Sequence, residues 1–219
     1  MHDILPPYIN IHSHHEAADP EVLTLVSRYA HFDQRDAKQR YSLGIHPWYI
    51  SDAPVQLEQL AAHLGDPDVL ALGECGLDRL CTTDWDLQRK TFARQIALAN
   101  RYRKPLVIHC VKAFPEVLSL LQDARVPVVF HGFNNRPSLA AEVLSRGHYL
   151  SFGAALLRED AVAAGVLATV PADRFLLETD DRQDLDIREI YRRASIIRKT
   201  GEDVIILQLQ KNFQKVVQT

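Results

Sequence analysis

The stretch KPLVIHC, residues 104–110, is a short apolar run that ends close to a histidine. Its apolar residues are continuous rather than alternating, which is typical of a parallel β-strand buried on both faces. Seven other stretches have a similar character: YINIH (8–12), EVLTLVS (21–27), RYSLGIHP (40–47), DVLALGECG (68–76), VPVVFHG (126–132), HYLSFGA (148–154) and RFLLETDD (174–181). The sequence therefore predicts eight strands.

Helical patterns lie between the later strands. The clearest covers residues 84–103, where Phe92 and Ile96 share one side and Asp84 or Asp86 is a candidate N-cap. Similar patterns cover residues 113–124, 136–147 and 184–200. Strands that alternate with helices predict an α/β fold with a parallel sheet, and eight of them predict a (β/α)8 TIM barrel. With 219 residues, that barrel would be compact and slightly abbreviated.

The domain organisation expected from the sequence is simple. No internal repeat, low-complexity segment or linker marks a boundary, so we expect a single domain over residues 1–219. The early part of the chain is compressed, because only residues 30–39 separate the second and third strands. A full crossover helix would be cramped there.

Composition and charge limit the class of protein. A net charge of −3 leaves no basic surface that would bind nucleic acid by bulk electrostatics. Three cysteines without a C-x-x-C pair argue against a disulfide framework and favour the reducing cytoplasm. The N-terminus has no signal-peptide pattern, and no apolar run approaches the roughly 18 residues of a membrane span. We therefore expect a cytoplasmic protein that does not enter a membrane.

Polar side chains recur at the carboxyl ends of these apolar runs. The candidates are His12, His14, His46, Glu74, His109, His131 and Asp180. In a (β/α)8 barrel all such strand ends meet at one rim, where active sites are built. We therefore expect these residues, although dispersed along the chain, to lie close together.

The residue types and their spacing indicate a metal site. His12 and His14 are two residues apart, so both imidazoles face the same side of an extended chain, and Glu178 and Asp180 repeat that spacing. Imidazole and carboxylate are ligands for divalent ions, and this set is large enough for one or two of them, with Glu74 as a bridge. The sequence does not decide between Mg²⁺, Mn²⁺ and Zn²⁺.

A simpler interpretation stands beside each single residue. One histidine at a strand end is more often a hydrogen-bonded or surface residue than a ligand, and only the repetition of the pattern favours a metal site. Cys75 and Cys110 directly follow candidate ligands and are interpreted as small buried fillers rather than nucleophiles. No G-x-S-x-G motif, P-loop or dinucleotide-binding fingerprint supports a competing chemistry.

An ordered set of motifs resembles one known family. The motifs are INIHSHH, LGIHPWY, ALGECGLD, PLVIHC, VVFHGF and LLETDD, which span residues 9–181. Together they resemble the TatD family of metal-dependent deoxyribonucleases, within the amidohydrolase-like TIM-barrel hydrolases. The resemblance implies a divalent-metal hydrolase, an exonuclease that removes nucleotides from DNA ends by cleaving phosphodiester bonds.

The resemblance also implies roles for individual residues. His46 would face the scissile phosphate, and Asp180 would orient or deprotonate the attacking water with Glu178 alongside it. These three are the candidate catalytic residues. The implied metal ligands are His12, His14, Glu74, His109, His131 and Asp180.

The chain departs from the family pattern at three places. Asn10 stands where the family usually has an aspartate, two residues before the first ligand histidine. After His109, the sequence CVKA replaces a common Arg-Asp pair, so Lys112 is the nearest cation, and a lysine binds phosphate as a point charge rather than a fork. The final motif continues as DRQDL, where Arg182 is a second candidate to offset phosphate charge.

Two alternatives to the nuclease remain open at this stage. The same metal site would also suit hydrolysis of a small amide, lactone or phosphoester, because a fold and a ligand set do not determine the substrate. A degenerate barrel that binds metal without catalysis is the other alternative, motivated by Asn10 and the absent arginine. The expected partner is a DNA end, with no membrane and no obligate protein partner, and the sequence does not indicate an oligomeric state.

Overall fold

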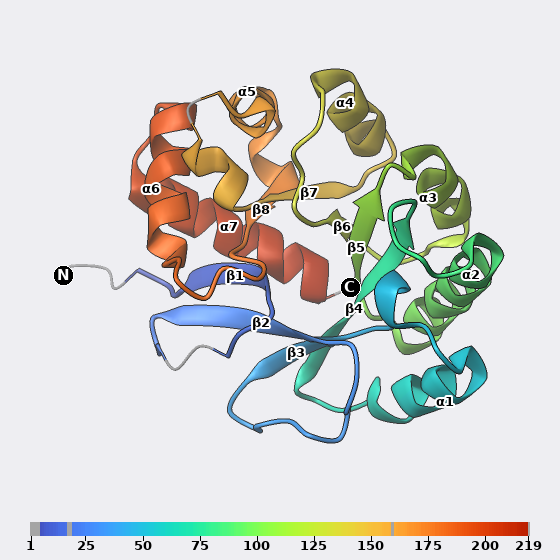
Figure 1. Cartoon of the computed structure of the whole chain (residues 1–219). Helices are drawn as coiled ribbons and strands as arrows, with labels where there is room; N and C mark the ends of the chain where they lie inside the picture. Colours follow the sequence, from blue (N-terminus) through green and yellow to red (C-terminus); the bar gives the residue numbers. More distant parts are fainter. Residues whose placement is uncertain (1–4, 17–18, 159, 219) are drawn as a thin grey trace. The chain divides into compact units, whose positions relative to one another are not determined.

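A computed structural model describes residues 5–16, 19–158 and 160–218 of the chain (Figure 1). Backbone contacts divide the chain into two compact units. The terminal unit consists of Met1–Leu25 with His131–Gln218, and the central unit consists of Val26–Phe130. The expected single domain over residues 1–219 stays a prediction.

The central unit is a parallel sheet covered by helices. Its strands are β3 (Arg40–Leu43), β4 (Val69–Asp78), β5 (Leu106–Val111) and β6 (Val128–Phe130), and β2 (Val22–Arg28) continues into it from the terminal unit. Its helices are η1 (Pro47–Tyr49), α1 (Ala53–His63), α2 (Trp85–Tyr102), α3 (Phe114–Leu120) and η2 (Leu121–Asp123). The pairs β3–β4, β4–β5 and β5–β6 are all parallel, as the continuous apolar runs predict.

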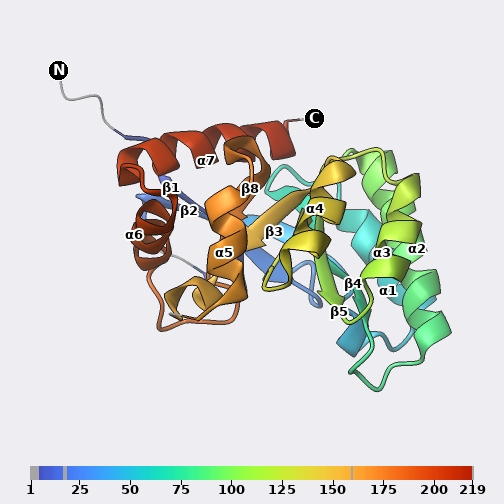
Figure 2. The same cartoon turned by 90° about the horizontal axis from the view of Figure 1, so that it is seen from above.

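The terminal unit combines both ends of the chain. Its strands are β1 (Tyr8–Ser13), β7 (Tyr149–Phe152) and β8 (Phe175–Leu177). Its helices are α4 (Pro137–Ser145), η3 (Ala154–Leu157), α5 (Val162–Thr169), η4 (Ala172–Arg174), α6 (Ile187–Arg198) and α7 (Glu202–Val217). β7 and β8 are parallel, and α7 packs against α6, β1 and β8 (Figure 2).

The strand order follows the sequence, from β1 to β8, which is the order of a (β/α)8 barrel. All eight predicted strands are confirmed, including the second. Residues 30–39 contain turns and no helix, as their number predicts. Helices follow the strands from β3 onward, and α1, α5 and α7 lie outside the predicted helical stretches. No helix in the described part of the chain combines the length and apolar character needed to cross a membrane.

Helix α2 shows how local sequence forms a helix that then holds the backbone next to a candidate site residue. Asp84 is its N-cap, with a side-chain oxygen that accepts from the N–H of Leu87 at 2.8 Å. Phe92 and Ile96 are buried as predicted. The helix also buries Gln95, whose amide accepts from the Ile45 N–H at 2.7 Å and donates to the Ile45 carbonyl at 3.1 Å. This contact holds the backbone directly before His46.

Candidate metal centres

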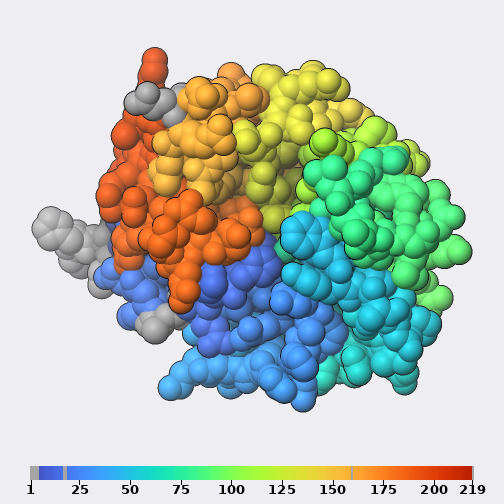
Figure 3. Space-filling view, in the orientation of Figure 1, coloured from blue at the N-terminus to red at the C-terminus, as the bar shows by residue number. Residues whose placement is uncertain are grey.

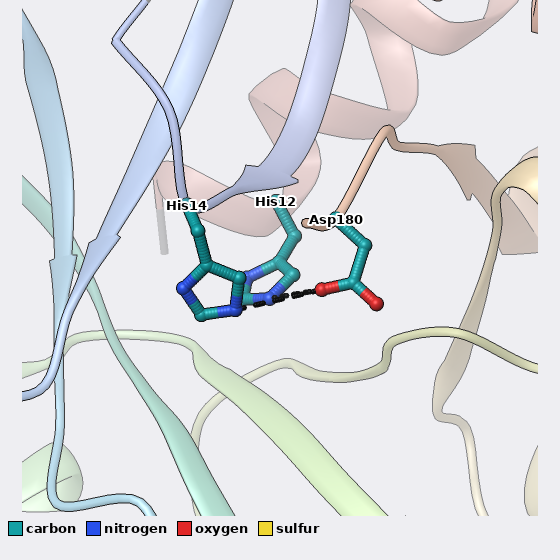
Figure 4. A group of neighbouring side chains, drawn as sticks. All are labelled: His12, His14 and Asp180. Carbon is teal, nitrogen blue, oxygen red and sulfur yellow. Dashed lines mark ion pairs between the residues drawn. The ribbon is translucent and has the colours of Figure 1, made fainter. Parts of the chain in front are cut away.

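The first group of candidate ligands lies in the terminal unit, where β1 runs beside the end of β8. The His14 N–H donates to the Asp180 carbonyl, and the Asp180 N–H donates to the His12 carbonyl, each at 3.0 Å. This parallel bridge between Ser13 and Asp180 places the Asp180 carboxylate beside the two imidazoles. Asp180 Oδ1 lies 3.4 Å from His12 Nε2 and 3.5 Å from His14 Nε2 (Figure 4).

Burial and charge around this group are uneven. His12 is wholly buried, whereas the Asp180 side chain is 38% exposed. Burial raises the pKa of Asp180, but hydrogen bonds from His12 and His14 and the charges of His12 and His131 outweigh it and hold that pKa below its usual range. Asp180 has a φ of 56°, so the chain turns sharply at this residue. An ionised carboxylate thus stands at the solvent edge of an imidazole pair.

His131 and Glu178 extend the group in the same unit. His131 Nδ1 lies 3.5 Å from Glu178 Oε1, and that oxygen also accepts the Gly132 N–H at 2.6 Å. Glu178 is fully buried, and among the described residues its Oε2 has no hydrogen-bond partner. Because a buried carboxylate oxygen is costly without a partner, this donor set fits a cation. His131, Glu178 and Asp180 each offer a ligand atom within 4.8 Å of the others.

The second group lies in the central unit, where His46 follows β3 and Glu74 and His109 lie on β4 and β5. Glu74 Oε1 lies 2.7 Å from His109 Nδ1 and 3.3 Å from His46 Nε2, and Glu74 itself is buried. Gly76 allows β4 to approach β5 closely here, because a Cβ at this position would meet the His109 carbonyl oxygen at 1.9 Å. Two imidazoles and a carboxylate again fit a divalent ion.

Sequence reasoning missed Asp78, which completes the central group. Its buried carboxylate accepts from Trp48 Nε1 at 2.6 Å and from the Leu80 N–H at 2.7 Å, and it lies 3.1 Å from His109 Nε2. Burial raises the pKa of Asp78, but these hydrogen bonds outweigh it and lower the pKa. A signal was available, since Glu74 and Asp78 are four residues apart on one strand and so point to the same side.

The structure also explains the asparagine that departs from the family pattern. Asn10 Oδ1 accepts from the Thr179 N–H at 3.1 Å, and its Nδ2 donates to Thr179 Oγ1 at 2.9 Å. Both contacts are buried, and Thr179 directly precedes Asp180. Asn10 therefore fixes the backbone that carries the exposed carboxylate.

The remaining polar candidates have other roles. Arg182 forms two hydrogen bonds with Asp184, at 2.8 and 2.7 Å, so its guanidinium is already paired. Burial raises the pKa of the Cys75 thiol and raises that of Cys110 to about 12. Thiols with such high pKa values are poor nucleophiles, which agrees with their interpretation as fillers.

Comparison with known proteins identifies the family. A family model described as TatD related DNase matches residues 10–218. The chain belongs to the TatD family. An uncharacterized metal-dependent hydrolase, YcfH of Escherichia coli K12, is 32% identical to this TatD-family chain over 193 residues, which cover 80% of the chain and 72% of the relative.

Two further matches complete the comparison. A 3′–5′ ssDNA/RNA exonuclease TatD of Cronobacter turicensis is 35% identical over 160 residues, which cover 68% of this chain and 59% of the relative. The crystal structure of the TatD homologue YjjV of Escherichia coli K12 superimposes with a TM-score of 0.83 over 97% of this chain and 98% of that one, at 22% identity. The predicted family, barrel fold and class of metal-dependent hydrolase are thereby confirmed.

Proposed function

We propose that this TatD-family hydrolase is an exonuclease that cleaves phosphodiester bonds at DNA ends. The observation that carries the proposal is the group in the terminal unit, where Asp180 Oδ1 lies within 3.5 Å of the imidazoles of His12 and His14. The exonuclease name of the Cronobacter relative supports a nucleic acid as the substrate.

The proposed ligands follow from the two groups. His12, His14, His131 and Asp180 would hold a divalent ion in the terminal unit, and Glu74 and His109 would be ligands in the central unit. Such an ion supplies Lewis acidity, which makes a water more acidic and offsets charge on the phosphate. Imidazole and carboxylate donors suit Zn²⁺ and Mn²⁺, and carboxylates with waters suit Mg²⁺.

Asp180 is the residue best placed to handle the attacking water. One carboxylate oxygen faces the two imidazoles, and the other points away from both rings (Figure 4). The lowered pKa keeps this carboxylate ionised at neutral pH, so it accepts a hydrogen bond from water and orients it. Glu178, by contrast, is fully buried and contacts Gly132 and His131, which supports a role in holding His131.

His46 has a defined tautomer in its neutral form. The Trp48 N–H donates to His46 Nδ1 at 3.1 Å, so in neutral imidazole the proton resides on Nε2. That nitrogen faces the Glu74 carboxylate at 3.3 Å. The Nε2–H is therefore directed at Glu74, and the role proposed for His46, facing the scissile phosphate, rests on the family resemblance.

Replacing the exposed carboxylate tests the proposal. We expect Asp180→Ala to lower the turnover of end-labelled single-stranded DNA by about 10³-fold or more. The metal would lose a ligand, and the attacking water would lose the acceptor that orients it. Asp86→Ala is the matched control, because that aspartate is exposed and pairs with Arg89. Circular dichroism checks that both variants are folded, and full activity of the folded Asp180→Ala protein would contradict the proposal.

One observation favours a second candidate, hydrolysis of a small ester, amide or lactone. The net charge is −3, and Arg182 is already paired with Asp184, so this cation is not available to a phosphate backbone. Protein loaded with Mg²⁺, Mn²⁺ or Zn²⁺ and incubated with DNA and with a panel of small esters separates the candidates. A ladder that shortens from one end supports the exonuclease, whereas turnover of esters alone supports the second candidate. The cytoplasmic location and the lack of an obligate protein partner remain proposals.

A further inference from the structure

Three aromatic side chains of the central unit lie together on the surface. Trp48 is 54% exposed, Tyr49 is 46% exposed and Tyr29 is 37% exposed. In the space-filling view, the light-blue part of the chain, which includes η1, lies on the face toward the viewer (Figure 3). Isolated exposed apolar residues are normal, but a cluster of large aromatic rings indicates a binding surface. We call these three residues the aromatic platform.

The rings of the platform are arranged rather than scattered. Tyr29 and Tyr49 are stacked, with ring centroids 4.3 Å apart and an interplanar angle of 20°. The Trp48 ring centroid lies 6.4 Å from that of Tyr49, at 68° to it. Tyr29 directly follows β2, whereas Trp48 and Tyr49 belong to η1, so the tertiary fold assembles the platform.

Hydrogen bonds fix the platform before any ligand arrives. Trp48 Nε1 donates to Asp78 at 2.6 Å, which sets the direction of the indole. The Tyr49 N–H donates to the His46 carbonyl at 3.0 Å, and the Tyr49 carbonyl accepts from Gln56 at 2.9 Å. Binding to such a surface loses little free energy, because the aromatic side chains are already ordered.

The platform is next to the candidate metal group of the same unit. The His46 ring centroid lies 5.3 Å from that of Trp48 and 5.5 Å from that of Tyr49. The Trp48 ring centroid lies 6.2 Å from that of His109. A molecule resting on the platform would therefore place its neighbouring atoms beside His46.

We propose that the aromatic platform stacks nucleobases of a single-stranded nucleic acid whose phosphodiester lies at the His46–Glu74–His109 group. This inference rests on the proposed function and assigns the residues that bind the bases of its substrate. Every base presents a π-face, so stacking on aromatic side chains binds single strands with little sequence preference. Paired bases inside a duplex are already stacked and do not offer these faces.

The charge of the chain makes stacking the more important source of affinity. Proteins that bind by phosphate contacts carry clustered lysines and arginines, whereas this chain has a net charge of −3. The affinity for the bases should then exceed the affinity for the sugar–phosphate backbone. This difference is the measurable signature of the platform.

A comparison of two oligonucleotides tests the signature directly. The probes are a fluorescently labelled ten-nucleotide oligothymidylate and an abasic strand of the same length, measured by anisotropy with metal-loaded Asp180→Asn protein to prevent cleavage. Adding Trp48→Ala or Tyr49→Ala should weaken binding of the thymidylate roughly tenfold and leave binding of the abasic strand unchanged. Val55→Ala and Leu207→Ala are matched controls, because each side chain is 45% exposed elsewhere and should not affect either probe.

The two tryptophans allow an independent spectroscopic test. Trp85→Phe leaves Trp48 as the only indole, and its fluorescence should fall when the thymidylate is added and stay constant with the abasic strand. Trp48→Phe keeps an aromatic face, so it should bind the thymidylate within about threefold of the parent protein while the remaining Trp85 signal stays constant. Recovery by phenylalanine separates stacking from the hydrogen bond to Asp78.

Kinetics distinguish failure of the platform from failure of the nuclease. In otherwise unchanged protein, Tyr49→Ala should raise KM for single-stranded DNA about tenfold and change kcat by less than about twofold. Hydrolysis of DNA with an unchanged KM in both alanine variants would overturn the platform and leave the nuclease intact. Equal weakening of the thymidylate and abasic probes would also overturn it. Base-dependent binding without hydrolysis under any metal would support the platform and contradict the nuclease.

Discussion

The two candidate metal groups use the same residue types in opposite ways. In the terminal unit, one partly exposed carboxylate, Asp180, faces the imidazoles of His12 and His14. In the central unit, two buried carboxylates, Glu74 and Asp78, contact opposite nitrogens of one ring, that of His109. The first group is open on its carboxylate side, and the second is a buried hydrogen-bonded chain.

This difference predicts different effects of substitution in the two groups. A carboxylate at the solvent edge can reach a water, and replacing it removes a contact from one buried imidazole, that of His12. A buried carboxylate that holds an imidazole and an indole contributes to folding, and its loss takes this acceptor away from part-buried donors. Substitutions in the terminal group should therefore change mainly turnover, whereas substitutions in the central group should also change stability.

Removing Asp78 should produce the largest loss of stability. Asp78→Ala leaves the Trp48 and His109 ring nitrogens and the Leu80 N–H without their acceptor, so we expect the free energy of unfolding to fall by about 3–5 kcal/mol. Urea unfolding measures the change. Asp86→Ala removes an exposed aspartate that pairs with Arg89 and should cost less than about 0.5 kcal/mol. If Asp180→Ala destabilises the protein as much as Asp78→Ala, the contrast between the groups is wrong.

A methyl group at Gly76 should break the geometry that places His109. The added Cβ of Gly76→Ala would lie 1.9 Å from the His109 carbonyl oxygen, so β4 and β5 must separate. We expect a loss of about 2–3 kcal/mol in urea unfolding. Gly65→Ala is the control, because a Cβ there meets nothing within 4 Å, and it should change stability by less than about 0.5 kcal/mol. Equal effects of the two substitutions would show that the strands tolerate the methyl group.

Substitutions of Asn10 should show whether its contact with Thr179 or the identity of its side chain matters for the terminal group. Asn10→Ala removes both hydrogen bonds and should cost about 1–3 kcal/mol and lower turnover roughly 10- to 100-fold. Asn10→Asp can still accept from the Thr179 N–H, and the Thr179 hydroxyl can donate to it. The aspartate variant should therefore keep more activity than the alanine variant. Equal losses in both variants would mean that the amide itself, rather than the position of Thr179, is required.

The strands and the candidate ligands were readable from sequence because their signals are local. Continuous apolar runs mark parallel strands, and the spacing of His12 and His14 places both rings on one side of β1. Helix α1 is not predicted from the sequence, because it buries only Ala53 and Leu60 and so has little periodic apolar pattern. Helix α5 is apolar almost throughout, so it has no polar face to reveal its period. Helix α7, in contrast, buries several apolar residues in a readable pattern and was overlooked.

Contacts between distant segments were not predictable in the same way. The hydrogen bond from Trp48 to Asp78 joins residues on η1 and β4, and the stacking of Tyr29 on Tyr49 joins residues beyond β2 and on η1. Neither pair has a spacing that a periodic pattern could reveal. The pairing of Arg182 with Asp184, by contrast, is local in sequence, but it depends on the turn at these residues. A chain pattern identifies candidate ligands, but only the fold shows what each side chain contacts.

A histidine outside both groups provides a test that is specific to pH. Burial, with a contribution from the charge of Arg146, lowers the pKa of His148 in the terminal unit to about 4. Between the unfolded pKa near 6.5 and this folded value, the unfolded chain binds a proton that the folded chain excludes, so stability falls as the pH falls through that window. Replacing His148 with Gln removes this proton, so urea unfolding between pH 7 and pH 4 should give a shallower loss than in the parent protein. Identical pH slopes in the two proteins would show that the acid sensitivity arises elsewhere, with the ligand histidines of the metal groups as the next residues to test.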